Sequence, residues 1–343
     1  MRRVSTSAIG LAGAVSLVAF GTVAEARDQI RIVGSSTVYP FSTAVAEQFG
    51  NKSEFPTPVV ESTGSGGGLK LFCAGVGEEH PDITNASRRI KQSEVDMCAE
   101  NGIPDITEVK VGYDGIVLAN SKESDPMNIT LEQLWLALAK DVPVDGELQA
   151  NPHQMWSEID SGLPAVRIEV LGPPPTSGTR DAFVELAMEG GCEGFEEIKA
   201  LEKDAHAAAC QTIREDGAFV EAGENDNLIV QKLQANPAAF GVFGFSFLDQ
   251  NLDVLQGSSV GGVQPTFDDI AAGDYPVSRS LYFYVKNPHV DVIPGLKEYV
   301  EEFTSDAASG EEGYLADKGL IPLPDGDRSD VRDQAVSFTP MTM

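Results

Sequence analysis

Three times along this chain of 343 residues, a short apolar segment leads into a cluster of Ser, Thr and Gly and then into a pattern of helical period. The clusters are residues 34–37, 62–68 and 176–179. Apolar strands that alternate with amphipathic helices are typical of βα units, which build mainly parallel sheets. The sequence therefore predicts an α/β fold, and the chain length favours about two domains.

These clusters indicate an anion site. A helix begins with backbone N–H groups that no helical carbonyl accepts, and glycine lets an anion approach them. In α/β proteins, ligands bind at the carboxyl ends of strands, which is where all three clusters fall. A single Ser or Thr at a helix start is usually only a cap, so the prediction depends on the repetition. No cluster contains GxxxxGK[ST], which disfavours a nucleotide P-loop.

Two arginines fit such a site. Arg88 stands beside a second arginine, just after an apolar segment, in a chain with 24 Lys+Arg against 53 Asp+Glu. Arg180 lies in the first turn of a predicted helix, where a cation opposes the helix dipole and a bound anion would compensate it. A guanidinium presents a planar fork to an oxyanion. We therefore expect Arg88 and Arg180 to supply the positive charge.

The formal net charge of −29 excludes some partners. A chain this acidic is repelled by nucleic acid and by anionic membrane surfaces, so neither is expected to bind. A bound dianion is compatible with this charge because contacts are screened beyond a Debye length of about 8 Å.

The first 26 residues have the pattern of a signal peptide. Arg2 and Arg3 precede an uncharged run over residues 9–23, and Ala24-Glu25-Ala26 has the small-x-small form of a cleavage site. We expect cleavage after Ala26 and export of the remaining chain. An uncleaved anchor helix is the alternative.

Four cysteines, Cys73, Cys98, Cys192 and Cys210, are expected to pair in an exported protein. Three pairings are possible, and the one between neighbours, Cys73–Cys98 and Cys192–Cys210, closes two short loops. A metal site built from all four thiolates is the alternative, although no CxxC spacing occurs.

The sequence offers little support for an enzyme. Its histidines are scattered, with no HExxH motif, and its serine clusters are not the GxSxG elbow of hydrolases. We expect no catalytic residues, no metal and no cofactor.

Four motifs together resemble the phosphate-binding proteins of the PstS family, the periplasmic receptors of phosphate ABC transporters. They are GSSTVYPF at 34–41, TGSGGG at 63–68, DITNASR at 82–88 and TSGT at 176–179, in the family's order and spacing. The similarity continues at residues 113–115, 223–227, 241–245 and 319–324. It covers essentially the whole chain after the leader.

The resemblance implies the two-domain periplasmic-binding-protein fold (type II). Each domain would be a mainly parallel sheet flanked by helices, with the ligand cleft between the domains and two strands crossing it. Residues 27–115 plus 280–343 are predicted to form domain I, and residues 116–279 domain II. The Asp114-Gly115 dipeptide is expected to break residues 109–120 into two strands.

The resemblance also implies a phosphate site shared by both domains. The predicted ligand residues are Ser36, Thr37, Ser65, Ser87, Arg88, Ser177, Gly178, Thr179 and Arg180. The best-known branch of the family has an Asp where this chain has Ser87-Arg88. That branch also has an Arg and an Asp just before Ser-Gly-Thr, where this chain has Pro173 and Pro175.

This departure bears on specificity, because phosphate at neutral pH carries a proton and sulfate does not. A receptor that prefers phosphate needs an acceptor aimed at that proton. Asp114 is the candidate, and its alternative role is that of a turn residue before Gly115.

The predicted function is a monomeric periplasmic protein that captures inorganic phosphate and delivers it to the membrane permease of an ABC transporter. One alternative is a receptor for another tetrahedral oxyanion, such as sulfate, molybdate or arsenate. Others are a secreted phosphatase or hydrolase, and a surface adhesion or sensing protein that keeps the fold.

Overall fold

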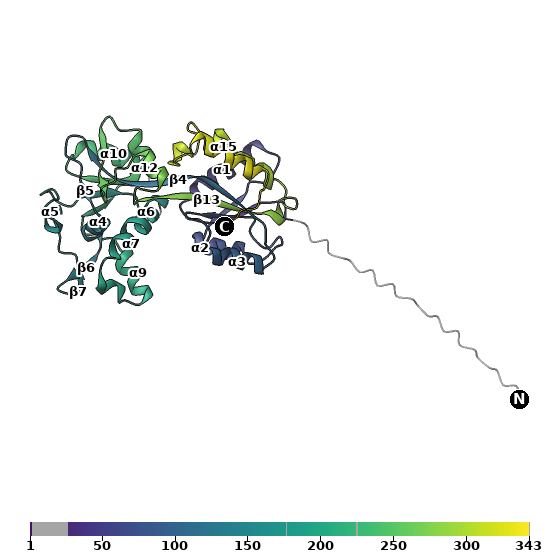
Figure 1. The fold of residues 1–343 in the computed structure, drawn as a ribbon, viewed down its shortest axis with the longest axis horizontal. Coiled ribbons are helices and arrows are strands. Elements are labelled where there is room, and N and C mark those ends of the chain that lie inside the picture. The colour runs from purple at the N-terminus through teal and green to yellow at the C-terminus, as the bar shows by residue number, and fades with distance from the viewer. Residues whose placement is uncertain (2–26, 176, 224–225, 343) are drawn as a thin grey trace.

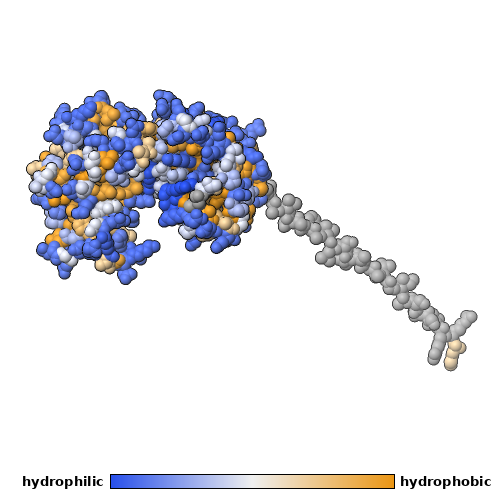
Figure 2. Space-filling view, viewed as in Figure 1, coloured by the Kyte–Doolittle hydropathy of each residue, from blue (hydrophilic) through white to orange (hydrophobic). Residues whose placement is uncertain are grey.

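The computed structural model describes residue 1 and residues 27–175, 177–223 and 226–342. The predicted leader lies outside these residues except for Met1, as do Thr176 and residues 224–225 of the quoted motifs. Figure 1 shows two lobes joined by the long strands β4 and β13. Hydrophilic residues gather where the lobes meet (Figure 2).

One sheet runs through both lobes and holds nine strands of the described chain. Its order is β2-β1-β3-β13-β4-β10-β8-β9, and β11 also pairs with β4. The strands are β1 Arg31–Gly34, β2 Val59–Ser62, β3 Ile83–Ala86, β4 Ile106–Ser121, β8 Val170–Gly172, β9 Phe219–Glu221, β10 Phe240–Gly244, β11 Leu255–Gly257 and β13 Ser278–Lys286. Two small pairs are β5 Asn128–Ile129 with β12 Ser259–Val260, and β6 Asp141–Val144 with β7 Glu147–Ala150.

Within this sheet, β1 pairs in parallel with β2 and β3 in the first lobe, and β8 pairs in parallel with β9 and β10 in the second. The antiparallel pairs of the large sheet all involve β4 or β13. The predicted α/β class is confirmed.

Helices cover the sheet in both lobes (Figure 1). In the first lobe they are α1 Tyr39–Lys52, α2 Ser65–Phe72, α3 Gln92–Glu100, η2 Asn287–His289, α13 Leu296–Phe303, α14 Asp306–Ser309, η3 Ala316–Lys318 and α15 Asp325–Val336. In the second they are α4 Leu131–Leu138, α5 Trp156–Ile159, α6 Gly178–Phe183, the π-helix η1 Val184–Met188, α7 Glu189–Cys192, α8 Glu196–Lys199, α9 Lys203–Gln211, α10 Asp226–Ala235, α11 Phe245–Asp249 and α12 Phe267–Ala272. None of the helices in the described ranges is both long and apolar enough to cross a bilayer.

The expected strand pair at residues 109–120 is wrong, because β4 is one continuous strand over Ile106–Ser121. Its first part pairs with β13, and residues 116–120 pair with β10. The Asp114-Gly115 dipeptide stays extended because both of its residues pair with β13, which takes up backbone hydrogen bonds that a turn would otherwise satisfy.

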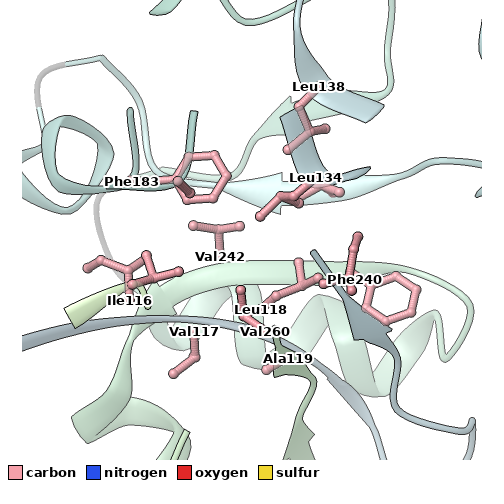
Figure 3. Packing of buried hydrophobic residues seen from close by; sticks show 14 of the residues in the cluster. Ile116, Val117, Leu118, Ala119, Leu134, Leu138, Phe183, Phe240, Val242 and Val260 are labelled. Atoms are coloured by element: carbon pink, nitrogen blue, oxygen red, sulfur yellow. The ribbon is translucent and has the colours of Figure 1, made fainter. Parts of the chain in front are cut away.

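Each lobe has its own apolar core. The core of the second lobe includes Ile116–Ala119 of β4, which are buried on both faces of the sheet, together with Val242 and Phe183 (Figure 3). In the first lobe, Val109, Phe283 and Phe303 belong to a separate cluster. The sequence of a strand that is covered on both faces is a continuous run of apolar residues rather than an alternation of apolar and polar ones. The exact domain boundaries stay a prediction.

Glycine allows α2 to pack against the end of β1. Gly34 has a φ of +129°, and a Cβ at Gly68 would lie 2.4 Å from the Gly34 Cα and 2.7 Å from Thr84 Oγ1. No side chain fits at that contact. It therefore fixes how closely the start of α2 approaches the strand ends.

Replacing Gly68 with Ala is expected to lower the free energy of unfolding by about 1–3 kcal/mol, the usual cost of overpacking a tight contact. Gly67→Ala is the matched control, since a Cβ there would meet only Thr63, at 3.7 Å or more. Denaturant unfolding of both variants checks this. Equal effects of the two substitutions would contradict the role given to the contact.

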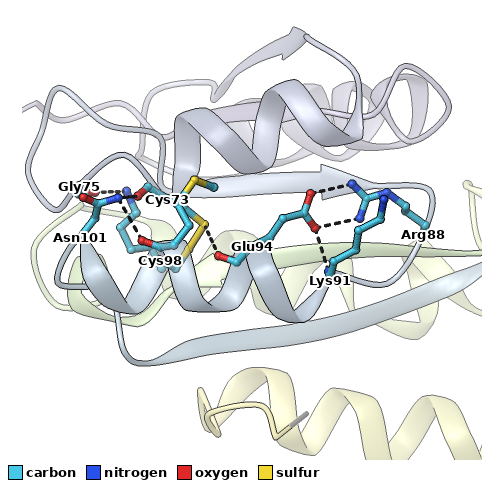
Figure 4. The surroundings of a disulfide bond; sticks show 9 residues. Cys73, Gly75, Arg88, Lys91, Glu94, Cys98 and Asn101 are labelled. Atoms are coloured by element: carbon cyan, nitrogen blue, oxygen red, sulfur yellow. Dashed lines mark hydrogen bonds and ion pairs between the residues drawn. A yellow bond between two sulfur atoms is a disulfide. The ribbon is translucent and has the colours of Figure 1, made fainter. Parts of the chain in front are cut away.

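Both disulfides between neighbouring cysteines are present, Cys73–Cys98 and Cys192–Cys210, which confirms that pairing among the three possible ones. Figure 4 shows the first, between α2 and α3. The His206 ring lies within 4.8 Å of Cys192 and Cys210. Because those two sulfur atoms are bonded to each other, they are not thiolate ligands for a metal.

Candidate functional site

A cavity of about 730 Å³ lies between the two lobes. The first lobe contributes Ser36 and Thr37 to its wall, and the second contributes Ser177, Gly178 and Thr179. The other lining residues are Tyr39, Pro40, Phe41, Ser62, Asp114, Asp181, Asn227, Gly244, Phe247, Asp317, Lys318 and Gly319. The cavity is thus lined by residues of all three predicted clusters, the middle one through Ser62 alone.

The first cluster forms the turn between β1 and α1. The Ser35 N–H donates to the Asn85 carbonyl at 2.9 Å, which ties the turn to the end of β3. Helix α1 then begins at Tyr39 with Pro40 in its first turn, where a missing N–H costs no helical hydrogen bond. Ser36 and Thr37 therefore face the cavity at the positive end of α1.

The third cluster, described from Ser177 onward, is the start of α6. Ser177 caps this helix, since its Oγ accepts a hydrogen bond from the Thr179 N–H at 3.2 Å. A Cβ at Gly178 would lie 3.2 Å from the Ser36 carbonyl oxygen and 3.5 Å from the Thr37 Cα. The two turns therefore meet across the cavity, and the glycine leaves room for this approach.

Arg279, on the crossing strand β13, lies directly behind this meeting point. It is opposite Asp114 in the β4–β13 ladder. Its guanidinium donates to Thr37 Oγ1 at 2.6 Å and to Glu185 Oε2 at 2.5 Å, and its Nε lies 3.5 Å from Asp114 Oδ2. The side chain is only 8% exposed. Arg279 therefore places a buried positive charge against two residues of the cavity wall.

Asp114 is the carboxylate of this arrangement that lines the cavity. Burial raises the pKa of the Asp114 carboxyl, and the nearby Arg279 guanidinium opposes that rise. Asp114 Oδ2 is buried and accepts no hydrogen bond within the described chain. Beside its ion pair with Arg279, this oxygen keeps an unfilled acceptor position, which suits the proton of a ligand.

Arg88 is engaged elsewhere. Its guanidinium donates two hydrogen bonds to the Glu94 carboxylate, at 2.9 and 2.7 Å (Figure 4). This pairing raises the pKa of the Arg88 guanidinium. Both terminal nitrogens of Arg88, the predicted partner of the anion, thus already donate to a carboxylate of the protein itself.

The other predicted residues outside the cavity lining also have internal contacts. Ser87 N–H donates to Ser65 Oγ at 3.0 Å, and the two hydroxyls lie 3.1 Å apart. Arg180 donates to the Pro173 carbonyl at 3.2 Å and its guanidinium stacks over the Phe219 ring at 4.2 Å. Burial lowers the pKa of the Arg180 guanidinium.

Comparison with known proteins decides the family, because the model of the PBP superfamily domain matches residues 21–307. The chain belongs to the PBP superfamily. The expected periplasmic-binding-protein fold, with its two domains, is thereby confirmed.

Relatives of this PBP superfamily protein agree with the resemblance found in the sequence. Protein SphX of Synechococcus elongatus is 30% identical over 85% of this chain and 76% of its own length. The phosphate-binding protein PstS of Staphylococcus saprophyticus is 29% identical over 86% of this chain and 80% of its own. Among solved structures, a possible phosphate binding protein from Planctomyces limnophilus has 27% identity and a TM-score of 0.71, covering 91% of this chain and 98% of that one.

Of the nine predicted ligand residues, the structure brings Ser36, Thr37, Ser177, Gly178 and Thr179 to the cavity of this PBP superfamily protein. Sequence reasoning missed Arg279, Lys318 and Glu185. One signal for Arg279 was available, since a lone Arg between two serines begins an otherwise apolar strand segment at residues 278–285. Lys318 lies in an exposed 3₁₀ turn with no such signal.

Proposed function

We propose that this protein captures inorganic phosphate between its two domains and delivers it to the membrane permease of an ABC transporter. The observation that carries the proposal is the meeting of two helix-start turns, one from each domain, in front of a buried arginine. Helix starts and a guanidinium both favour an oxyanion. The names of the relatives, among them a phosphate-binding protein PstS, favour phosphate as that oxyanion.

In this proposal, Ser36 and Thr37 donate to the phosphate from domain I, and residues 177–179 donate from domain II. Arg279 supplies the positive charge in place of Arg88 and Arg180, whose guanidinium groups already have internal partners. Asp114 accepts the proton of hydrogen phosphate through Oδ2, which accepts no hydrogen bond within the described chain.

The mechanism is closure of the two domains about the crossing strands β4 and β13. A ligand that contacts both turns binds the closed form better, and it shifts the population toward that form by this difference in affinity. The permease then recognises the closed form. No step makes or breaks a covalent bond, so we propose a binding protein rather than a hydrolase, with no cofactor.

The leader pattern at residues 1–26 and the two disulfides favour export to the periplasm. We propose that the mature chain begins at Arg27 and acts there as a monomer.

Calorimetric titration of the mature protein with phosphate, sulfate and molybdate tests the proposal, after unfolding and dialysis to remove carried-over ligand. Micromolar or tighter binding of phosphate alone is expected. Tight binding of sulfate or molybdate instead would make the protein a receptor for a different oxyanion. Binding of none of the three would reject the function.

Replacing Ser177 with Ala is expected to weaken phosphate binding about 10- to 100-fold, since one hydrogen bond to a charged group contributes roughly 1.5–3 kcal/mol. Ser305→Ala is the matched control, because Ser305 caps α14 in the same way, with its Oγ accepting from the Ala308 N–H at 3.2 Å. That substitution removes a helix cap outside the cavity lining. Equal affinities of the two variants would argue against a cradle at Ser177.

A further inference from the structure

We propose that Glu185 is a built-in competitor for the anion: its carboxylate occupies Arg279 in the empty protein and releases it when an oxyanion binds. The inference rests on the proposed function, because it concerns the same site. In this inference Glu185, which is not one of the predicted ligand residues, sets the affinity of the site for the anion.

The contacts of Arg279 support this role. Its guanidinium donates to Glu185 Oε2 at 2.5 Å and to Thr37 Oγ1 at 2.6 Å. Thr37 lines the cavity. The arm of the arginine that reaches the cavity wall and the arm that holds Glu185 therefore belong to one planar group, and an oxyanion bound at Thr37 competes for the same fork.

The charges around the cavity require such a release. Among the residues that the structure describes, Asp114, Asp181 and Asp317 line it against one lysine, Lys318. Arg279 stands behind the wall between two carboxylates, Asp114 and Glu185. A phosphate dianion that entered this arrangement unchanged would meet an excess of negative charge. One carboxylate has to leave Arg279 for the dianion to gain a cation.

Glu185 is the carboxylate that is able to leave. Its side chain is 54% exposed, so water solvates the carboxylate once it swings away. The Asp114 side chain is 13% exposed and extends from a residue paired with Arg279 in the β4–β13 ladder. A buried carboxylate that loses its cation is not hydrated, so breaking its ion pair costs much free energy. An exposed carboxylate is hydrated after it leaves the cation, so breaking its ion pair costs little.

The helix around Glu185 suits a mobile side chain at this point. Glu185 lies in η1, a single π-helical turn over Val184–Met188 that continues α6. Single π-turns inside helices are frequent at functional sites. Because α6 also carries Ser177 at its cap, the helix that donates to the anion is the one that holds its competitor.

Glu185→Gln tests the inference by titration with phosphate at neutral pH. The amide keeps the size of the side chain but gives up the charge that holds Arg279, so phosphate is expected to bind about tenfold tighter or more. Glu185→Asp keeps the charge and shortens the reach, and it is expected to tighten binding as well, by less. Unchanged or weaker binding by Glu185→Gln would overturn the inference.

Glu193→Gln is the matched control, since it removes the same charge from an exposed position on the same lobe. An equal gain in affinity from this control would mean that only the general charge of the lobe matters, which also overturns the inference. The wild-type titration separates the two proposals. If the wild type binds no phosphate, the proposed function fails; if it binds and Glu185→Gln does not differ, only the role of Glu185 fails.

Discussion

Replacing Arg279 with Gln is expected to weaken phosphate binding by at least about 100-fold, or roughly 3 kcal/mol, as truncating one partner of a buried charge pair does. The guanidinium is almost fully buried, contacts Thr37 in the cavity wall and is opposite Asp114. Its loss removes the positive charge behind the site and leaves the Asp114 carboxylate facing the cavity without its counter-charge. Isothermal titration of the variant with phosphate measures the loss.

Arg279→Lys distinguishes the contribution of the positive charge from that of the planar guanidinium geometry. A lysine ammonium keeps the charge but makes point contacts, so an intermediate loss of about tenfold is expected. Arg89→Gln is the control, because Arg89 pairs with the Glu108 carboxylate at 2.9 Å on the far part of β4 and is half exposed. A thermal melt of each variant establishes that it folds. Wild-type affinity in a folded Arg279→Gln variant would remove the arginine from the site.

The sequence predicted the two turns of the cavity because their signals are local. A strand end, a Ser/Thr/Gly cluster and a helix start follow one another within a few residues, as they do at Gly34–Thr37. The neighbour-to-neighbour disulfides were likewise among the few possible pairings. Such features depend on nearby residues, and the fold needs only to bring the finished turns together.

The charged residues of the site were harder to predict because their partners are distant in sequence. Arg279 gains its role from the register that sets it opposite Asp114, and from the packing that brings Glu185 of the second lobe to it. Arg88 looked available because its neighbours in sequence are not acidic, yet one turn into α3 Glu94 closes on it. An arginine is therefore assigned to a site only after its carboxylate partners are known.

The continuous strand β4 explains the remaining error and connects it to function. Asp114-Gly115 has the composition of a turn, and the sequence alone favours that interpretation. In the structure the dipeptide lies where the strand passes from the first lobe to the second, so Asp114 sits beside the cavity. A residue that seemed to end a strand instead places an acceptor in the cleft.

Replacing Asp114 with Asn is expected to lower the ratio of phosphate to sulfate affinity by at least about 100-fold, since a site built to hydrogen-bond one hydroxyl group rejects analogues that lack it by 10⁴–10⁵-fold. A carboxylate accepts the proton of hydrogen phosphate and repels sulfate, which has no proton to donate. The Asn amide is able to turn its NH₂ group toward sulfate instead. Titration of the wild type and of Asp114→Asn with phosphate and with sulfate measures the ratio.

Asp181→Asn is the control for this ratio, because Asp181 also lines the cavity and loses the same charge. This substitution is expected to increase the affinity for both anions alike and to leave the ratio of the two affinities unchanged. An unchanged ratio in Asp114→Asn would contradict the role of Asp114 as proton acceptor.

The pH dependence gives a second, independent measure of the same carboxylate. Burial raises the pKa of Asp114 in the folded protein, with Arg279 opposing and Glu185 adding to the rise. Asp114 therefore takes up its own proton at a higher pH than an ordinary aspartate and stops accepting the phosphate proton there. As pH falls toward that range, phosphate affinity of the wild type is expected to approach that of Asp114→Asn. The pH profile of Asp114→Asn serves as the reference for changes that do not involve this carboxylate. A ratio that stays constant from neutral pH down into the ordinary carboxyl range would mean that Asp114 never holds the ligand proton, and the preference for phosphate would then have to come from donors alone.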